Sequence, residues 1–480
     1  MRSGTYCTLL LCGLLGVSGA LAQPKKTMYD QLFRSPGTTL YHVPIGLCED
    51  YPEETTTPEL IKGDMELLKR TGINLLRISF GWDGIETEKG KFHWGFWDDY
   101  VRTAVDEYGI TLVPYICYTP RWNSTGDSTN YWNHTPIDYN EFGVFVEALV
   151  SHFKDRIKTW ELWNEPDIRE FWSGNAEDLA RLTKLGVQAV RKADPTAKIV
   201  LAGLAGHTEF TLSLFRDYGI SPYVDIVNCH SYFETWNGNP LEAVVPYVNT
   251  LADIIARYGN GQSLWMAEVG YSTYRKPDGY VSYQYHCTYD YEHTLDYQPI
   301  ALWRTLTLLL STGKMAAITW YEVKDLPPGE DVIGDVNNRN LGVDFVGHKP
   351  KPAEAGLKFF NLFFAQKNRC LDKVTTIRRT LGSDSKIHCF EMEDGTLAVV
   401  AWLATHIDGR AGDATPGNLK DTRSETVDLT LPGKGIKHGM QYDALGNAKP
   451  FNAFRAEGGN VLISGLPIQG GEIVILKLGK

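Results

Sequence analysis

The strongest constraint on the fold is an alternation of short apolar runs with helical segments over residues 41–321. Eight runs have the length and composition of buried strands: 41–47, 73–80, 110–118, 158–164, 198–202, 224–232, 263–268 and 316–321. Segments with helical periodicity separate them, including 59–70, 140–153, 176–193 and 241–258. Eight strand–helix units predict a (β/α)8 TIM barrel. A doubly wound sheet would also alternate, but it usually has a glycine-rich phosphate turn after its first strand, and this sequence has none there.

The sequence pattern changes beyond Phe364. Helical periodicity stops, and short alternating strands separated by turn residues follow at 386–390, 397–402, 426–431 and 472–478. We therefore predict a catalytic barrel over residues 23–364 and a C-terminal β-sandwich accessory domain over residues 365–480. Strand ends rich in polar residues do not recur in this domain, so we expect it to support the barrel without supplying a catalytic residue.

Residues 1–22 have the pattern of a signal peptide. Arg2 precedes an apolar run at 9–17, and Ala-Leu-Ala at 20–22 is a small-x-small cleavage site. The run is too short to span a bilayer, and no later stretch is long and uncharged enough. We expect cleavage near Ala22 and a secreted or periplasmic protein without a membrane span.

Charge and cysteine usage exclude several classes of partner. The net charge is −11 and no basic block is present, which disfavours nucleic acid. Neither the cysteines nor the histidines fall in metal-ligand spacing, so we predict no metal and no cofactor. Cys370 and Cys389 form the most plausible disulfide, and buried free thiols are an equal alternative for the other cysteines. The sequence leaves the oligomeric state open.

The fourth predicted strand ends in Trp-Asn-Glu-Pro at 163–166. Pro166 cannot donate to a sheet ladder, so the strand should stop there and leave Glu165 at its carboxyl end. Strict alternation would place Glu161 and Glu165 on one face and Asn164 on the other. Active sites of TIM barrels lie at this end of the strands, which makes Glu165 the first catalytic candidate.

Other strand ends supply a second carboxylate and its neighbours. Polar or aromatic candidates from these ends are Arg77, His230, Tyr232, Glu268 and Trp320. Glu268 directly ends its apolar run, which favours it over Glu234 and Glu322. Two carboxyl groups facing each other across a barrel mouth are the arrangement that glycosidic cleavage needs.

The remaining candidates suit the same chemistry. Arg77 and Tyr232 would keep Glu268 ionised with a depressed pKa, while Glu165 would stay protonated. Arg77 would also neutralise Glu161 inside the barrel. Asn164 would bind a sugar hydroxyl, and Trp320 would form the floor beneath the sugar ring. The structural alternative for His230, a hydrogen-bond donor in the core, is equally compatible with the sequence.

These motifs resemble glycoside hydrolase clan A, most closely family 39 and then family 5. Trp-Asn-Glu-Pro on the fourth strand, a glutamate ending the seventh and a tryptophan on the eighth carry the resemblance, and segments 77–82, 90–94 and 230–232 fit it. It covers most of residues 41–365. The resemblance implies a retaining O-glycosyl hydrolase in which Glu165 is the acid/base and Glu268 the nucleophile.

A tyrosine-rich insertion at 271–298 bears on the substrate. It contains Tyr271, Tyr274, Tyr280, Tyr283, Tyr285, Tyr289, Tyr291 and Tyr297. Such a loop would wall one side of the site, with Trp122 and Trp132 opposite, and favours an oligo- or polysaccharide bound in an open cleft. An exo-acting glycosidase and a non-catalytic carbohydrate-binding barrel remain the alternatives.

Overall fold

The computed structural model describes residues 32, 40–50, 56–236, 238–275, 287–328, 336–379, 384–405 and 417–480. The predicted signal peptide and Tyr280, Tyr283 and Tyr285 lie outside these residues. Within the described ranges, no helix is both long and apolar enough to cross a bilayer.

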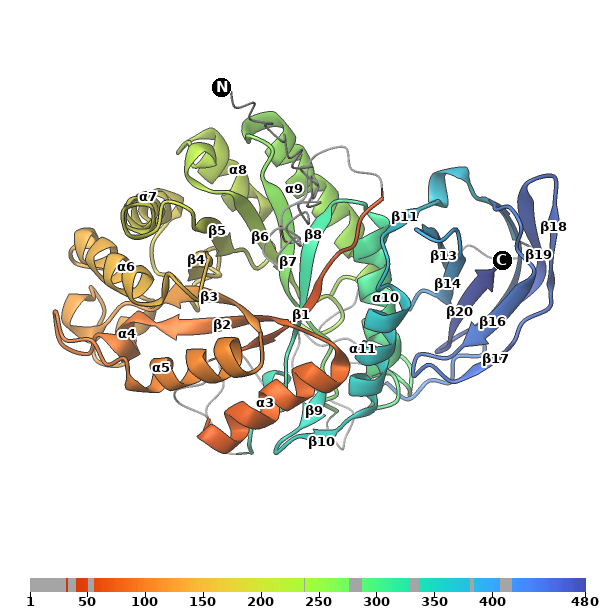
Figure 1. Cartoon of the computed structure of the whole chain (residues 1–480), viewed down its shortest axis with the longest axis horizontal. Helices are drawn as coiled ribbons and strands as arrows, with labels where there is room; N and C mark the ends of the chain where they lie inside the picture. The colour runs from red at the N-terminus through yellow and green to blue at the C-terminus, as the bar shows by residue number, and fades with distance from the viewer. Residues whose placement is uncertain are drawn as a thin grey trace, which may run out of the picture.

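Eight parallel strands close into a barrel in sequence order, which confirms the predicted fold (Figure 1). Their bounds are β1 Ile45–Glu49, β2 Leu75–Gly81, β3 Thr111–Cys117, β4 Thr159–Asn164, β5 Lys198–Gly203, β6 Ile226–Ser231, β7 Ser263–Val269 and β8 Met315–Tyr321. The first strand was predicted too early. It begins after Pro44, which has no N–H to donate to a neighbouring strand, and continues to Glu49.

Helices surround the barrel, as the periodicity predicted. They are α3 Pro58–Thr71, α4 Trp82–Ile85, α5 Gly95–Val101, α6 Tyr139–Phe153, α7 Ala176–Ala193, α8 Thr208–Arg216, α9 Val244–Tyr258, α10 Gln298–Ser311 and α11 Pro352–Phe363. Local signals fix their ends. In α7, Asn175 and Asp178 form a capping box that satisfies N–H groups of the first turn. The helix α5 continues directly as a π-helix over Arg102–Glu107.

The C-terminal residues form two antiparallel sheets, ordered β11-β13-β14-β20-β16-β17 and β12-β15-β19-β18. The strands are β11 Asn368–Cys370, β12 Thr376–Arg379, β13 Ser385–Met392, β14 Leu397–Leu403, β15 Ser424–Pro432, β16 His438–Tyr442, β17 Ala448–Pro450, β18 Phe454–Glu457, β19 Asn460–Gln469 and β20 Ile473–Gly479. A short hairpin, β9 Asp344–Phe345 with β10 Lys349–Pro350, precedes α11. The predicted β-sandwich is therefore present.

The larger sheet packs on the barrel through α10 and α11, which lie between the two parts in Figure 1. Alternation along β14 explains how the side chains of one strand pack into two apolar cores. Val400 and Trp402 belong to the core shared with the barrel, whereas Val399 and Ala401 belong to the core between the two sheets. The accessory domain is thus joined to the barrel by a continuous apolar interface.

The predicted disulfide between Cys370 and Cys389 is wrong, because both residues are free thiols. Cys370 lies opposite Phe390 in the pairing of β11 with β13. Cys389 is the neighbour of Phe390, so its side chain points to the other face of the sheet and into the core between the sheets. Proximity in a hairpin does not place two side chains on one face.

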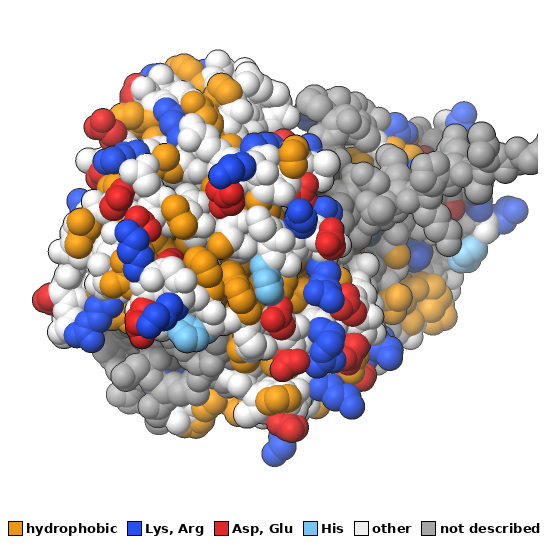
Figure 2. Space-filling model, turned by 60° about the vertical axis from the view of Figure 1, so that its left-hand side comes forward, with side chains coloured by type: hydrophobic (Ala, Val, Ile, Leu, Met, Phe, Trp, Pro, Cys, Tyr) orange, Lys and Arg blue, Asp and Glu red, His pale blue; other side chains and the backbone are white. Residues whose placement is uncertain are grey.

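Figure 2 shows the side of the barrel around α6 and α7, where acidic and basic side chains are interspersed. Lys192 of α7, for example, pairs with Glu147 of α6 at 2.7 Å. Such exposed pairs contribute about 0–1 kcal/mol each. On this face the charges therefore form a mixed, solvated surface.

Candidate active site

The carboxyl end of β4 departs from regular strand geometry. Trp163 has φ 89° and Glu165 has φ 41°, values that are uncommon for residues other than glycine. The ring of Trp163 turns outward and packs at 4.8 Å from Trp172, measured between ring centroids. As a result Glu161 and Asn164 both point into the barrel, where strict alternation had placed them on opposite faces. The prediction failed because one left-handed residue breaks the alternation.

Arg77 of β2 connects the charged groups inside the barrel. Its Nε and Nη2 atoms donate to Glu161 at 2.8 and 2.9 Å, and Nη1 donates to Glu268 at 2.5 Å. Nη2 also donates to Asn164 at 2.8 Å, and the guanidinium lies 4.1 Å from the ring centroid of Tyr115. Arg77 therefore neutralises Glu161 and contacts Glu268 at once, the two roles that the sequence suggested.

The two candidate carboxylates face each other across the barrel mouth. Nδ1 of His230 lies 2.8 Å from Oε1 of Glu165 and 3.5 Å from Oε2 of Glu268, and the Tyr232 hydroxyl donates to Oε2 of Glu268 at 2.7 Å. One side-chain atom from each of Glu165, His230 and Glu268 lies within 4.8 Å of the others. Carboxylate oxygens this close are compatible with the separation of about 5–5.5 Å in retaining glycosidases, and inverting enzymes keep their carboxyl groups roughly 6.5–9.5 Å apart. The structure brings together all these predicted residues.

Burial controls the acidity of both carboxyl groups. It raises the pKa of Glu165 to about 8, and the nearby charge of Asp167 adds to the effect. It also raises the pKa of Glu268 to about 7, although the charge of Arg77 acts in the opposite direction. The expected depressed pKa of Glu268 is therefore wrong, because loss of water outweighs the attraction of the Arg77 cation. Glu165 still holds its proton to higher pH than Glu268.

Trp320 does not form a floor for the site. Its side chain is fully buried in the main apolar core, so no ligand can reach the ring. The next residue, Tyr321, joins Cys48 and Leu341 in a cluster at the mouth, with its ring centroid 5.9 Å from that of Tyr232. Two adjacent aromatic residues end β8, and alternation sends only one of them inward. The prediction chose the wrong one.

Asp50 is a third carboxylate at the site, and sequence reasoning missed it. It follows β1 and accepts a hydrogen bond from the hydroxyl of Tyr115. One side-chain atom from each of Cys48, Asp50 and Glu268 lies within 4.8 Å of the others, and Asp50 is partly exposed. An acidic residue at the end of the first strand was the available signal. It was missed because that strand was predicted to end two residues before Glu49.

Trp122 lies in a 3₁₀ turn after β3 and is half-buried. Its Nε1 atom donates to the backbone oxygen of Glu86 at 2.7 Å, and its ring lies edge-on to Trp82 with centroids 6.2 Å apart. These contacts fix the indole in the protein. Contact of Trp122 with a substrate stays a prediction.

The described tyrosines of the insertion mostly pack into the protein. Tyr271, Tyr289 and Tyr297 are buried, and the hydroxyl of Tyr291 donates to Asp421 of the C-terminal domain at 3.1 Å. The expectation that they wall an open cleft is therefore wrong for these residues. Their aromatic faces contact neighbouring side chains, such as the ring of Tyr289 on that of Tyr291 with centroids 5.3 Å apart.

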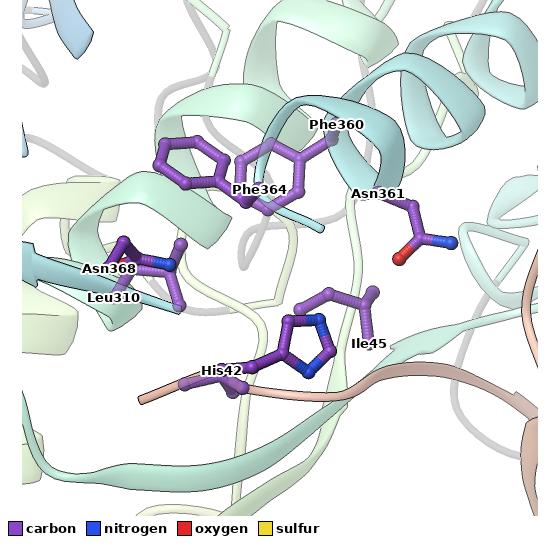
Figure 3. Close-up of a pocket in the computed structure, with 8 residues that line it drawn as sticks. His42, Ile45, Leu310, Phe360, Asn361, Phe364 and Asn368 are labelled. Atoms are coloured by element: carbon purple, nitrogen blue, oxygen red, sulfur yellow. The ribbon is translucent and has the colours of Figure 1, made fainter. Parts of the chain in front are cut away.

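Figure 3 shows a pocket at the other end of the barrel. It is lined by His42, Val43, Ile45, Leu310, Phe360, Asn361, Phe364 and Asn368. Ile45 is the first residue of β1, whereas Glu165 and Glu268 lie at the carboxyl ends of their strands. Residues at this end of a TIM barrel generally serve stability.

The side chains of Glu165, His230 and Glu268 are also close enough together to coordinate a metal ion. Cys48, Asp50 and Glu268 form a second such group. Both groups share Glu268, which already accepts a hydrogen bond from the Arg77 cation. A second positive charge there would be repelled by Arg77, so the arrangement suits acid–base chemistry better than metal binding.

Comparison with known proteins agrees with this geometry. Residues 66–245 match the family model of glycosyl hydrolases family 39. This family 39 segment contains Arg77, Glu165 and Tyr232, and Glu268 follows it. The predicted resemblance to family 39 of clan A is confirmed.

Curated relatives and solved structures extend the comparison. A beta-xylosidase of Geobacillus stearothermophilus is 29% identical over 150 residues, which are 28% of this chain and 30% of that protein. A beta-xylosidase of Caldicellulosiruptor saccharolyticus is 28% identical over 141 residues, 26% of this chain and 28% of that protein. The chain therefore matches less than a third of the length of these relatives.

Two solved structures share the fold over most of this chain. A family 39 glycoside hydrolase from Bacteroides cellulosilyticus WH2 has a TM-score of 0.64 at 16% identity, covering 91% of this chain and 81% of that one. A monomeric beta-xylosidase from Caulobacter crescentus CB15 has a TM-score of 0.62 at 18% identity, covering 92% and 97% of the two chains. At these identities the likeness shows a common fold.

Proposed function

We propose that this protein is a retaining glycoside hydrolase in which Glu165 is the acid/base and Glu268 the nucleophile. The observation that carries the proposal is the pair of buried carboxyl groups facing each other within 4.8 Å. The match of residues 66–245 to family 39 supports it. A non-catalytic carbohydrate-binding barrel would not need two carboxyl groups at the spacing of the retaining mechanism.

In the proposed mechanism each residue has one step. Glu165 donates its proton to the glycosidic oxygen while Glu268 attacks the anomeric carbon, so the leaving group departs and a glycosyl ester forms on Glu268. Glu165, now ionised, takes a proton from water, which attacks the same carbon and releases Glu268. Arg77 and Tyr232 donate hydrogen bonds to Glu268 and stabilise its charge when it leaves. Two inversions give net retention.

For the substrate, we favour a terminal β-linked sugar. Glu165 is 7% exposed and Glu268 is 5% exposed, which suits a narrow pocket better than an open cleft. The tyrosines of the insertion that pack into the protein also favour a pocket over an open cleft. Relatives named beta-xylosidase and beta-glucosidase are a third support, so the exo-acting alternative now stands ahead of the polysaccharide cleft.

Product analysis tests this proposal. The purified chain is assayed on 4-nitrophenyl β-xyloside and β-glucoside, on xylo-oligosaccharides and on xylan, with early products separated by chromatography and their anomers followed by proton NMR. We expect monosaccharide as the only early product, released first as the β-anomer. Early mixed oligomers would indicate an endo-acting enzyme. Saccharide binding without any hydrolysis would favour the non-catalytic barrel.

Export is part of the proposal and rests on the signal-peptide pattern of residues 1–22. Expression of the full chain in a secreting host, followed by mass spectrometry, tests it. We expect a mature N-terminus near Gln23. Retention of the intact N-terminus inside the cell would contradict export.

Asp50→Asn should lower kcat/KM on a β-glycoside by roughly 10- to 100-fold, because a hydrogen bond to a charged group contributes about 1.5–3 kcal/mol. We expect Asp50 to accept a hydrogen bond from a sugar hydroxyl, since it lies beside Glu268 and is partly exposed. Steady-state kinetics with a matched deoxy-sugar substrate measures the effect. On the deoxy substrate that lacks the contacted hydroxyl, the variant and the wild type should have nearly equal kcat/KM.

Asp99→Asn, at an exposed position of α5, is the matched control and should behave like the wild type. Equal kcat/KM for Asp50→Asn and wild type on every sugar tested would remove Asp50 from the binding site.

A further inference from the structure

The turn that follows β6 has an unusual backbone at Glu234. This residue has φ 59°, in the left-handed region, and its side chain has no exposed surface. The turn is tight, because the N–H groups of Thr235 and Trp236 both donate to the backbone oxygen of Tyr232, at 3.1 and 3.0 Å. A residue other than glycine holds this conformation only where its surroundings fix it.

The C-terminal domain supplies part of that fixation. Oε1 of Glu234 accepts hydrogen bonds from the hydroxyl of Thr405 at 2.5 Å, from the N–H of Leu241 at 3.1 Å and from Nη2 of Arg304 at 3.4 Å. Thr405 lies just after β14 of the larger sheet of the sandwich. The sandwich therefore holds a turn of the barrel mouth through a buried, charge-assisted hydrogen bond.

A second contact from the sandwich enters the same buried network. Nη2 of Arg304 donates to Oε1 of Glu242 at 3.0 Å, and Nε1 of Trp402 donates to that oxygen at 2.7 Å. Arg304 has no exposed surface, and its Nη1 donates to the hydroxyl of Tyr297 at 2.6 Å. The segment from Glu234 to Glu242 is thus held at both ends by side chains of the sandwich.

The same turn begins at Tyr232, which touches the candidate nucleophile. The Tyr232 hydroxyl donates to Oε2 of Glu268 at 2.7 Å, and its ring packs on Trp236 with centroids 4.7 Å apart. A shift of the turn would therefore move this donor relative to the carboxylate. Displacements of about 1 Å are enough to cost a large factor in rate.

We propose that the C-terminal domain positions the nucleophile of the barrel: Thr405, acting through Glu234, holds the turn that aims Tyr232 at Glu268. This inference rests on the proposed function and gives the sandwich a part in the reaction beyond support. Thr405 and Glu234 are positioning residues, because their contacts run through the turn and the reacting groups are Glu165 and Glu268. This role does not require the sandwich to supply a catalytic residue.

Two substitutions of Thr405 in the full chain test the proposal. Thr405→Val keeps the shape of the side chain but removes the hydroxyl that donates to Glu234, whereas Thr405→Ser keeps the hydroxyl. We expect Thr405→Val to lower kcat on an aryl β-glycoside by roughly 10- to 100-fold with KM nearly unchanged. Thr405→Ser should retain wild-type kcat. Equal kcat in all three proteins would overturn the proposal.

A double-mutant cycle with Tyr232→Phe separates positioning from general destabilisation. If Thr405 acts through Tyr232, the double variant should lose no more kcat than Tyr232→Phe alone. Losses that multiply would show that Thr405 acts by another route and would overturn the proposal. Should Thr405→Val fail to fold, Trp402→Phe removes the donor to Glu242 with an aromatic ring kept, and the same cycle applies.

Activity of the wild-type chain distinguishes the two levels of inference. An active wild type with an unaffected Thr405→Val contradicts the positioning role and leaves the proposed function standing. A wild type that hydrolyses no glycoside contradicts both.

Discussion

Glu268→Gln is expected to lower kcat by several powers of ten while the chain keeps its fold. An amide cannot form the glycosyl ester of the retaining mechanism, so the first displacement is lost. The fold should survive because glutamine has the same shape as glutamate. Arg77 also keeps its hydrogen bonds to Glu161 and Asn164 in the barrel.

The same substitution should raise the free energy of unfolding relative to the wild type, and this difference should grow as pH rises. Burial raises the folded-state pKa of Glu268 from 4.5 to about 7, so the folded state binds this proton more tightly than the unfolded state does. Between these values the free energy of unfolding of the wild type falls with increasing pH. Glutamine does not titrate, so the free energy of unfolding of the variant should rise relative to that of the wild type across this pH range. Chemical unfolding at several pH values measures the difference.

Glu59 lies at an exposed position of α3. The substitution Glu59→Gln removes one negative charge away from the site and serves as the control. Azide with Glu268→Ala gives a second measurement, since a small nucleophile in place of the carboxylate should yield a glycosyl azide of inverted configuration. Near-normal turnover of Glu268→Gln would move the nucleophile to another residue.

Much of the barrel was predictable because its signals are local. Apolar runs bounded by caps and turns predict the strands, and parallel strands of a barrel present their carboxyl ends on one face. Glu165 and Glu268 end two such runs, so their meeting followed from the fold class alone. The position of Asp50 was equally local and was missed only through an error in the end of β1.

Other features depend on information that the pattern lacks. Trp320 and Tyr321 are adjacent aromatic residues at the end of β8, and the apolar run does not indicate which of them alternation places toward the mouth. Glu268 was expected to be acidic because Arg77 is nearby, but its pKa depends on how much water the folded site excludes. The contact of Thr405 with Glu234 joins residues far apart in the chain, and no local signal indicates it.

Glu165→Ala should abolish the alkaline limb of the pH–rate profile. In the wild type, Glu268 must lose its proton, with a pKa of about 7, and Glu165 must keep its proton, with a pKa of about 8. Activity should therefore rise through the first value and fall through the second. Burial also lowers the pKa of His230, so a neutral imidazole faces Glu165 at neutral pH and does not promote loss of the Glu165 proton.

The size of the loss should depend on the leaving group. On an unactivated glycoside, removal of the general acid should cost about 10²–10⁴-fold in kcat/KM. On an aryl glycoside with an acidic leaving group, cleavage needs little protonation, so the loss should be much smaller and the alkaline limb should flatten. The acid limb should remain, because it reports loss of the Glu268 proton and Glu165 is uncharged in the pH range where Glu268 titrates.

Azide supplies the stereochemical test of this assignment. In Glu165→Ala it can occupy the space of the missing carboxylate and attack the glycosyl ester on Glu268, which gives a glycosyl azide of retained configuration. Glu170→Ala, an exposed glutamate that follows the same strand, is the matched control and should keep both limbs. An unchanged alkaline limb in Glu165→Ala, or an azide product of inverted configuration, would assign the acid to another residue.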